Sequence, residues 1–260
     1  MIANARMYGA APAAAAAWRR LLETALARAG LDWPVIDHPP PAPIDTLWER
    51  ADIGCVFMCG LPFSRRRPRP MAIAAPIPAA EGRPIYRTDF VVRADAPFRT
   101  LEDTFGHRLA WTVEHSQSGF SAPRWHLLRY RTPQRPYLYR ATVGNLHTPR
   151  RVIEAVLSGE AEVGPLDSYF HALARRHAPD LVAGLRTIAS TEPTPIPLLA
   201  GAPDLDPAIA ERLCAALLET PEDLLEPLLL QGFVRPDPDD YTVLAERVSI
   251  AERVGYPEPA

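Results

Sequence analysis

Apolar and polar positions alternate along the chain with two distinct periods, and these periods predict its elements. Between Trp18 and Ala29 the apolar residues recur every three or four positions, which is typical of a helix with one buried face. Gly30 follows at the position where helices commonly end. Shorter apolar runs, bounded by proline, glycine and polar residues, predict strands. The expected strands are residues 3–8, 53–58, 71–77, 85–93, 108–113, 137–143, 161–166 and 181–189, and the expected helices are 18–29, 44–49, 101–103, 120–128, 149–158, 169–176 and 241–254.

Two further helices are predicted from their capping residues. Asp206 is a good N-cap, and Pro207 suits the first helical position. Thr220 opens the second helix, and Gly232 is expected to close it.

From residue 108 onward, a strand, a polar loop and a helix follow one another three times. This order predicts a parallel sheet with crossover helices. Ligands of such sheets bind at the carboxyl ends of the strands. Three loops leave those ends, and we name them the serine loop (residues 116–119), the histidine loop (144–148) and the aspartate loop (167–168).

The serine loop consists of Ser116, Gln117, Ser118 and Gly119. Its small side chains and its glycine let backbone N–H groups approach an anion closely, and the start of a helix adds favourable partial charge. The loop is therefore a candidate anion-binding site. The alternative interpretation is that Ser118 is an ordinary helix N-cap.

The other two loops add candidates of different chemistry. The histidine loop offers His147 and Thr148, and the aspartate loop offers Asp167, which would accept a hydrogen bond from a ligand hydroxyl or amine. Each residue also has a structural interpretation. His147 would be a structural histidine, and Thr148 and Asp167 would cap the helices that follow them.

Composition narrows the classes of function. The net charge of −3 makes nucleic acid an improbable partner. No apolar run approaches the length of a membrane helix, so membrane insertion is not expected. The sequence contains no P-loop, no dinucleotide-binding glycine motif, no serine-hydrolase elbow and no metal-binding histidine spacing, so we expect no cofactor and no metal. The three cysteines are too few, and odd in number, for a disulfide framework.

Four short motifs resemble those of one family. They are Ser-x-Ser-Gly at residues 116–119, Gly-x-x-His at 144–147, Gly-x-Ala-Glu-Val-x-x-x-Asp at 159–167, and Thr-x-Pro-x-Pro at 191–195. Together they are similar to the phosphonate-type substrate-binding proteins of ABC transporters. The chain also departs from this pattern. Gln117 stands where phosphonate-selective relatives often carry threonine, two residues rather than one small one separate Gly144 from His147, and no signal peptide is visible.

The resemblance implies an α/β, type 2 periplasmic-binding-protein fold with two lobes, each a mostly parallel sheet flanked by helices. Residues 1–93 and 191–260 would form lobe 1 and residues 94–190 lobe 2, joined by crossing strands near Arg93 and residues 191–195. Ligand would bind between the lobes, which would close by a hinge motion. In such relatives the serine loop and the histidine hold an oxyanion, and tyrosines of the first lobe line the other wall. By position these are Tyr8 and Tyr86, unless both are core aromatics.

The leading functional hypothesis is therefore a monomeric, non-catalytic binding protein for a small anion, with an ABC permease as partner. Phosphate, phosphonate, phosphite and small carboxylates all suit the predicted site. One alternative is a cytoplasmic enzyme on the same fold, similar to chorismate dehydratase, with His147 or Asp167 as general base. Another is a cytoplasmic ligand sensor. Residues 1–6 show no signal-peptide pattern, which indicates the cytoplasm, or the periplasm if the chain is a processed form.

Overall fold

The computed structural model describes residues 1–260, and the chain divides into two compact units. Unit 1 comprises Met1–Ile85 and Pro195–Thr242, and unit 2 comprises Tyr86–Thr194 and Val243–Ala260. The expected α/β fold with two lobes is confirmed.

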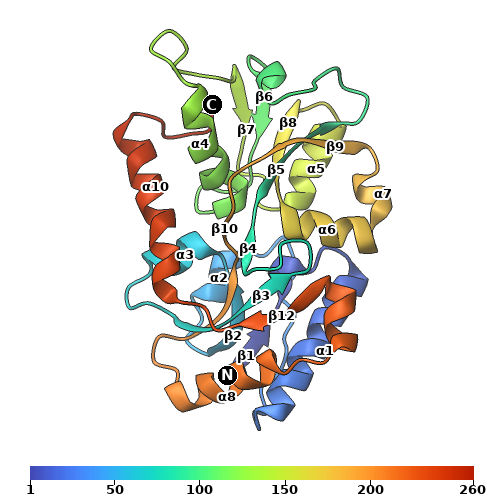
Figure 1. The fold of residues 1–260 in the computed structure, drawn as a ribbon, viewed down its shortest axis with the longest axis vertical. Helices are drawn as coiled ribbons and strands as arrows, with labels where there is room; N and C mark the ends of the chain where they lie inside the picture. Colours follow the sequence, from blue (N-terminus) through green and yellow to red (C-terminus); the bar gives the residue numbers. More distant parts are fainter. The chain divides into compact units, whose positions relative to one another are not determined.

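The sheet of unit 1 has five strands in the order β1-β2-β11-β3-β12, and Figure 1 labels β1, β2, β3 and β12. Strand β1 runs parallel to β2, whereas β11 is antiparallel to both β2 and β3, and β12 is antiparallel to β3. The strands are β1 Ile2–Asn4, β2 Ile53–Met58, β3 Met71–Pro78, β11 Leu198–Gly201 and β12 Leu230–Val234. The helices of this unit are α1 Pro12–Arg28, α2 Ile44–Trp48, α3 Gly60–Arg65, α8 Pro207–Leu218 and α9 Glu222–Leu225, with 3-10 turns η1 Arg6–Tyr8, η5 Glu226–Leu228 and η6 Pro238–Tyr241.

Three aromatic side chains pack together in the core of unit 1. The ring of Phe57 lies 5.1 Å from that of Tyr8 and 4.9 Å from that of Trp18, in edge-to-face contacts. All three side chains are almost completely buried. Such pairs stabilise a core beyond the area they bury, so the contacts fix α1 and η1 against β2.

The sheet of unit 2 has five strands in the order β7-β6-β8-β5-β9. Strand β6 is parallel to β7 and β8, whereas β5 is antiparallel to β8 and β9. The strands are β5 Thr88–Arg93, β6 Arg108–Ala110, β7 Ala141–Val143, β8 Val163–Asp167 and β9 Leu185–Ser190. The helices are α4 Ala122–Leu127, α5 Pro149–Leu157, α6 Ser168–His177, α7 Pro179–Val182 and α10 Thr242–Arg253, with short helical segments η2 Glu102–Thr104, η3 Gln117–Ser121 and η4 Leu128–Tyr130.

Both sheets are therefore mixed rather than mostly parallel. In unit 2 the reason is that β5 enters the sheet beside β8 in the opposite direction, and β9 returns beside β5. This difference matters for the site, because the beginning of β5 lies at the same edge as the carboxyl ends of β6, β7 and β8.

The division of the chain differs from the predicted one at two places. Strand β5 pairs with β8 and β9, so it belongs to unit 2, and the boundary falls after Ile85 instead of after Arg93. The chain passes between the units at β4 (Ile85–Tyr86) and β10 (Thr194–Pro195), which form a two-stranded sheet. Residues 243–260 join unit 2, although we expected them in lobe 1.

The C-terminal segment is packed firmly on unit 2. Tyr256 is completely buried in its hydrophobic core, and the guanidinium of Arg131 lies 4.2 Å from the centre of the Tyr256 ring. Arg124 of α4 donates a hydrogen bond of 2.8 Å to the carbonyl of Pro257. Figure 1 shows α10, in red, beside α4, and the guanidinium of Arg247 lies over the Trp125 ring.

Several predicted elements are wrong or misplaced. The helix expected at residues 220–232 ends early, because Leu229 adopts a left-handed conformation with φ of 54° and the chain continues as β12. The strand expected at residues 3–8 stops at Asn4, whose side chain accepts a hydrogen bond from the amide of Arg6. Of the strand expected at 137–143, only Ala141–Val143 pairs. A strand was expected at residues 181–189, but its first two residues form the end of α7, and β9 starts only at Leu185.

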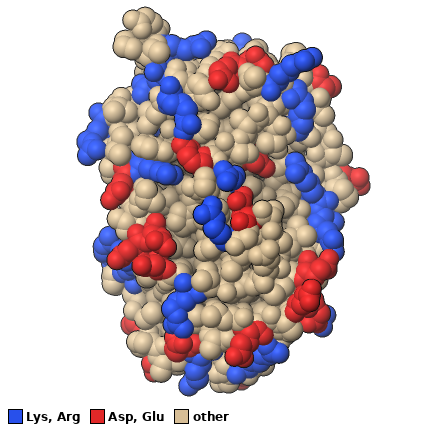
Figure 2. Space-filling view, viewed as in Figure 1, with Lys and Arg blue, Asp and Glu red and all other residues tan.

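The surface carries both signs of charge. On the face shown in Figure 2, basic and acidic side chains are interspersed rather than gathered into areas of one sign, in keeping with the net charge of −3. None of the helices has the length and apolar character needed to cross a bilayer. All three cysteines are free and buried.

Candidate anion-binding site

The three candidate loops lie at one edge of the unit 2 sheet. Strands β6, β7 and β8 run parallel, so their carboxyl ends meet at a common edge, and the serine, histidine and aspartate loops follow these ends. Strand β5 begins there too, because its first residue, Thr88, lies opposite Asp167 in the β5–β8 pairing.

The serine loop opens a helical segment. The hydroxyl oxygen of Ser116 caps it by accepting a hydrogen bond of 2.9 Å from the amide of Gly119. Residues Gln117–Ser121 form one turn of π-helix that leads directly into α4, and such turns are frequent at functional sites. The first amides of a helix have no acceptor within it, so this segment presents N–H donors at the sheet edge.

Gly119 is required by close packing. A β-carbon at this position would lie 1.9 Å from the hydroxyl oxygen of Thr112. The backbone of Gly119 is also held close to Thr112, because the Thr112 amide donates a hydrogen bond of 3.2 Å to the Gly119 carbonyl. No larger residue fits here without displacing Thr112.

The histidine loop has an unusual backbone. Asn145 and His147 have φ angles of 57° and 63°, in the left-handed region that non-glycine residues rarely adopt. The amides of Leu146 and His147 donate to the carbonyls of Trp111 and Thr112, over 3.3 and 3.2 Å. Strain of this kind gathers at binding sites, where the surrounding structure maintains it. The His147 side chain is exposed.

Thr148 caps α5, because its side chain accepts a hydrogen bond of 3.3 Å from the amide of Arg151. The structural interpretation of this residue is therefore correct, and it leaves the Thr148 hydroxyl hydrogen available to a ligand.

Asp167 is the N-cap of α6. Its Oδ1 atom accepts hydrogen bonds of 2.9 Å from the amides of both Tyr169 and Phe170. The residue is buried, and burial together with the nearby Asp167 carboxylate raises the pKa of Tyr169 well above its usual value. Capping is thus part of its role, as the alternative interpretation held.

Two threonines, Thr88 and Thr112, link the three loops by hydrogen bonds. Thr88 donates through its hydroxyl to the carbonyl of Ser118, over 3.1 Å, and lies opposite Asp167, so it links the serine and aspartate loops. Thr112 links the serine and histidine loops through its bonds with Gly119 and His147. The structure therefore brings together every candidate that was predicted on these loops.

Sequence analysis missed Arg87 and Thr88. The amide of Arg87 donates to the Ser168 hydroxyl over 3.0 Å, and its guanidinium donates to the carbonyl of Thr191 over 3.3 Å. The only signal was their place at the start of an apolar strand. That strand was expected in lobe 1, which separated Arg87 and Thr88 from the three loops of lobe 2, whereas both residues belong to unit 2.

The two predicted tyrosines are core residues. Tyr8 lies in unit 1 and is fully buried against Phe57 and Trp18. Tyr86 belongs to β4 and is 1% exposed. The core interpretation describes the position of both rings, and neither presents a surface to a ligand in this structure.

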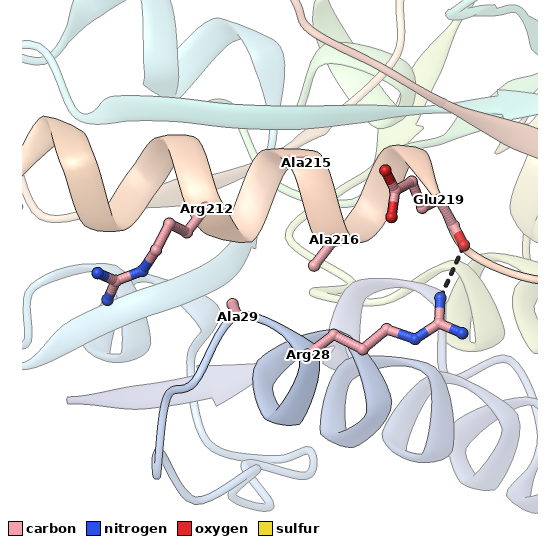
Figure 3. Close-up of a pocket in the computed structure, with 6 residues that line it drawn as sticks. All are labelled: Arg28, Ala29, Arg212, Ala215, Ala216 and Glu219. Atoms are coloured by element: carbon pink, nitrogen blue, oxygen red, sulfur yellow. Dashed lines mark hydrogen bonds between the residues drawn. The ribbon is translucent and has the colours of Figure 1, made fainter.

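A separate hollow lies in unit 1, between the end of α1 and α8 (Figure 3). Alanines form its floor, and the side chains of Arg28 and Arg212 extend toward opposite ends of it. The Arg28 guanidinium donates to the carbonyl of Glu219 over 2.8 Å. Because the two guanidinium groups diverge, they do not form a common anion site.

Comparison with known proteins identifies the family. Residues 49–241 match the model of the phosphonate periplasmic substrate-binding proteins of ABC transporters. The chain belongs to this family. The matched region contains all three loops, and proteins of the family are transporter components that bind a small molecule and work with a permease. No curated protein matches the chain.

Solved structures agree with this family in fold. A binding-protein component of an ABC phosphonate transporter from Pseudomonas aeruginosa has a TM-score of 0.78 at 14% identity, over 97% of this chain and 86% of that one. PhnD1 from Prochlorococcus marinus, solved with methylphosphonate, has a TM-score of 0.76 at 14% identity, over 98% of both chains. A Xanthomonas citri protein solved with ATP has a TM-score of 0.63 at 22% identity, over 97% of both chains.

Proposed function

We propose that this protein captures a small phosphorus oxyanion, phosphate or a phosphonate, at the three-loop edge of unit 2. One observation carries the proposal: the serine loop presents the first amides of a helical segment and two serine hydroxyls beside the strained histidine loop. Backbone amides at a helix start, with small side chains that leave them accessible, are a common way of binding such anions.

Each loop has a distinct part in binding. The amides of Gln117, Ser118 and Gly119 donate to the anion. The Ser116 hydroxyl, whose oxygen accepts from the Gly119 amide in the ligand-free loop, donates its hydrogen to the anion as well. His147 adds a donor from the second loop, and Arg87 brings positive charge to the third.

Asp167 and Gln117 set the preference among oxyanions. The Asp167 carboxylate repels a fully ionised dianion but accepts a hydrogen bond from a P–OH, a hydroxyl or an amine. Gln117 is buried, so its side chain shapes the loop from below rather than from the solvent side. A singly protonated phosphate or a phosphonate with a hydrogen-bonding substituent suits this arrangement best.

We further propose that binding occurs in the periplasm, by a monomer that delivers the ligand to a permease without changing it. Family membership supports this role. An enzyme on the same fold would consume its ligand. Phosphorus NMR of the ligand recovered after long incubation distinguishes the two, because transport predicts the unchanged compound and catalysis predicts a product.

Isothermal titration calorimetry tests the binding proposal. The panel contains phosphate, phosphite, methylphosphonate, 2-aminoethylphosphonate, sulfate, ATP and a chorismate-like carboxylic acid. We expect saturable binding of one or more phosphorus oxyanions, reduced at least about tenfold in Ser118→Ala, the loss expected for one charge-assisted hydrogen bond. Ser158→Ala, on the same unit but at the end of α5, is the matched control. Binding of the carboxylic acid alone would contradict the proposal.

A further inference from the structure

Thr112 carries a polar atom that the folded protein leaves without a hydrogen-bond partner. The residue follows β6 and is 5% exposed, and its hydroxyl oxygen is buried and unpaired. An unpaired buried hydroxyl lowers the stability of a fold, and valine has nearly the same shape without this penalty. The hydroxyl therefore needs an explanation beyond packing.

The position of this hydroxyl points to the serine loop. The site that a β-carbon on Gly119 would occupy lies 1.9 Å from the Thr112 hydroxyl oxygen and 2.9 Å from that of Ser116. Both hydroxyls thus border the same small space beside Gly119. The Ser116 oxygen already accepts from the Gly119 amide, which leaves the Thr112 hydroxyl without a role in the ligand-free loop.

The backbone of Thr112 is held on both sides by hydrogen bonds to the two loops. Its amide donates to the Gly119 carbonyl over 3.2 Å, and its carbonyl accepts from the His147 amide over 3.2 Å. A hydroxyl on this residue therefore keeps its place when the loops around it adjust to a ligand.

We propose that Thr112 is a positioning residue for the anion, acting through Ser116; this inference rests on the proposed function. When the anion takes the hydrogen bond of the Gly119 amide, the Ser116 oxygen loses its donor. The Thr112 hydroxyl then donates to that oxygen in place of the amide, and the Ser116 hydroxyl donates to the anion.

The ligand-free and ligand-bound states differ in the pairing of the Thr112 hydroxyl. Without ligand, Gly119 donates to Ser116 and the Thr112 hydroxyl is unpaired. With ligand, the amide, the Ser116 hydroxyl and the Thr112 hydroxyl each donate to an acceptor. Binding thereby satisfies a buried group that the free protein leaves unsatisfied, and this favours the bound loop.

The test compares Thr112→Val and Thr112→Ser with the unchanged protein. Calorimetry with phosphate and methylphosphonate gives Kd, and thermal unfolding without ligand gives Tm. We expect Thr112→Val to keep or raise Tm while Kd rises about tenfold, the effect of one lost hydrogen bond. Thr112→Ser should restore Kd to within about threefold of the original, because the hydroxyl is retained.

Thr104→Val is the matched control. Thr104 is also a buried threonine of unit 2, but its hydroxyl bonds with the carbonyl of Leu101 over 2.6 Å and with the Tyr139 hydroxyl over 3.0 Å. This variant should lower Tm and leave Kd unchanged. In Ser116→Ala, adding Thr112→Val should cause no further loss of affinity, because Thr112 acts through Ser116.

The outcomes separate the two proposals. If the unchanged protein binds an oxyanion and Thr112→Val binds it equally well, the positioning role is overturned and the proposed function stands. If Thr112→Val lowers Tm and weakens binding with no rescue by serine, Thr112 has a packing role only. If the unchanged protein binds neither anion nor any other oxyanion of the panel, the proposed function fails, and the positioning role fails with it.

Discussion

At the scale of single residues, backbone conformation marks the site more clearly than side-chain type does. Gly119 allows close approach of Thr112, and Gly144 allows close approach of Trp111, whose indole lies 2.0 Å from the position of a β-carbon on Gly144. Two non-glycine residues of the histidine loop adopt positive φ. Serine, threonine and histidine are common on any surface, but these backbone constraints are not.

Gly119→Ala should both destabilise the protein and remove anion binding. The new methyl group would overlap the Thr112 hydroxyl, and overpacking of this kind costs about 1–3 kcal/mol. Chemical unfolding and calorimetry measure the two effects. Gly9→Ala is the control, because the nearest atom would lie at an ordinary 3.4 Å. Unaltered affinity in Gly119→Ala would show that the serine loop is not the binding site.

His147→Gly should raise stability and weaken binding at the same time. Glycine adopts the left-handed conformation without strain, which favours folding by about 1 kcal/mol, whereas the loss of the imidazole removes a donor to the anion. Asn145→Gly relieves similar strain and should stabilise the protein without changing Kd. Equal affinities of the two variants would rule out a binding role for His147.

At the scale of elements, α4 connects the serine loop with the segment that leads to β10. His126 on α4 forms a hydrogen bond of 3.2 Å with Glu192, and Arg129 of η4 pairs with the same carboxylate. Burial lowers the pKa of His126, although the Glu192 carboxylate acts in the opposite direction. Burial would raise the pKa of Glu192, but its hydrogen bonds and the nearby positive charges hold it below its usual value.

The free energy of unfolding should fall as the pH drops below the ordinary histidine value of 6.5. Because the folded-state pKa of His126 is lower than the unfolded one, the unfolded chain binds more protons in this window and gains stability relative to the fold. Glu192 adds a second loss at lower pH, as the carboxylate is protonated. His126→Gln should flatten the first part of the profile in urea unfolding. An identical slope in His126→Gln would contradict the assignment.

The C-terminal segment should be essential to unit 2. Tyr256→Ala removes a fully buried ring from the core and should destabilise the protein by about 3 kcal/mol in chemical unfolding. Val254→Ala, at a side chain that is 54% exposed, should change stability by less than about 0.5 kcal/mol. Similar small effects of both variants would mean that residues 243–260 are not part of the unit 2 core.

The sequence predicts elements best where one period or one cap dominates. Helices α1, α5 and α8 and strand β2 were found, because apolar spacing and N-cap residues specify them locally. The strand direction of β5 and the placement of residues 243–260 depend on long-range contacts that no local pattern shows. The position of the three loops at one sheet edge could be predicted, because each loop follows a strand in the local pattern. Arg87 and Thr112 were missed because their contacts with these loops are long-range.

At the scale of the whole molecule, the family and the fold agree with one function. The chain belongs to a family of phosphonate-type substrate-binding proteins. At the carboxyl ends of parallel strands, where ligands of such sheets bind, unit 2 has three loops that share hydrogen bonds through Thr88 and Thr112. The central claim is that these loops, and the serine loop above all, hold the anion.

The most direct measurement is amide NMR of the ¹⁵N-labelled protein during titration with phosphate and with methylphosphonate. The account predicts saturable shifts, largest for the amides of Gln117, Ser118 and Gly119, with the Gly119 signal moving downfield as its hydrogen bond passes from Ser116 to the anion. The account would be contradicted if the saturable shifts occurred at other amides, for example those of Arg28 and Arg212 in unit 1, and not at the serine loop. The absence of any saturable shift with either anion would contradict it as well.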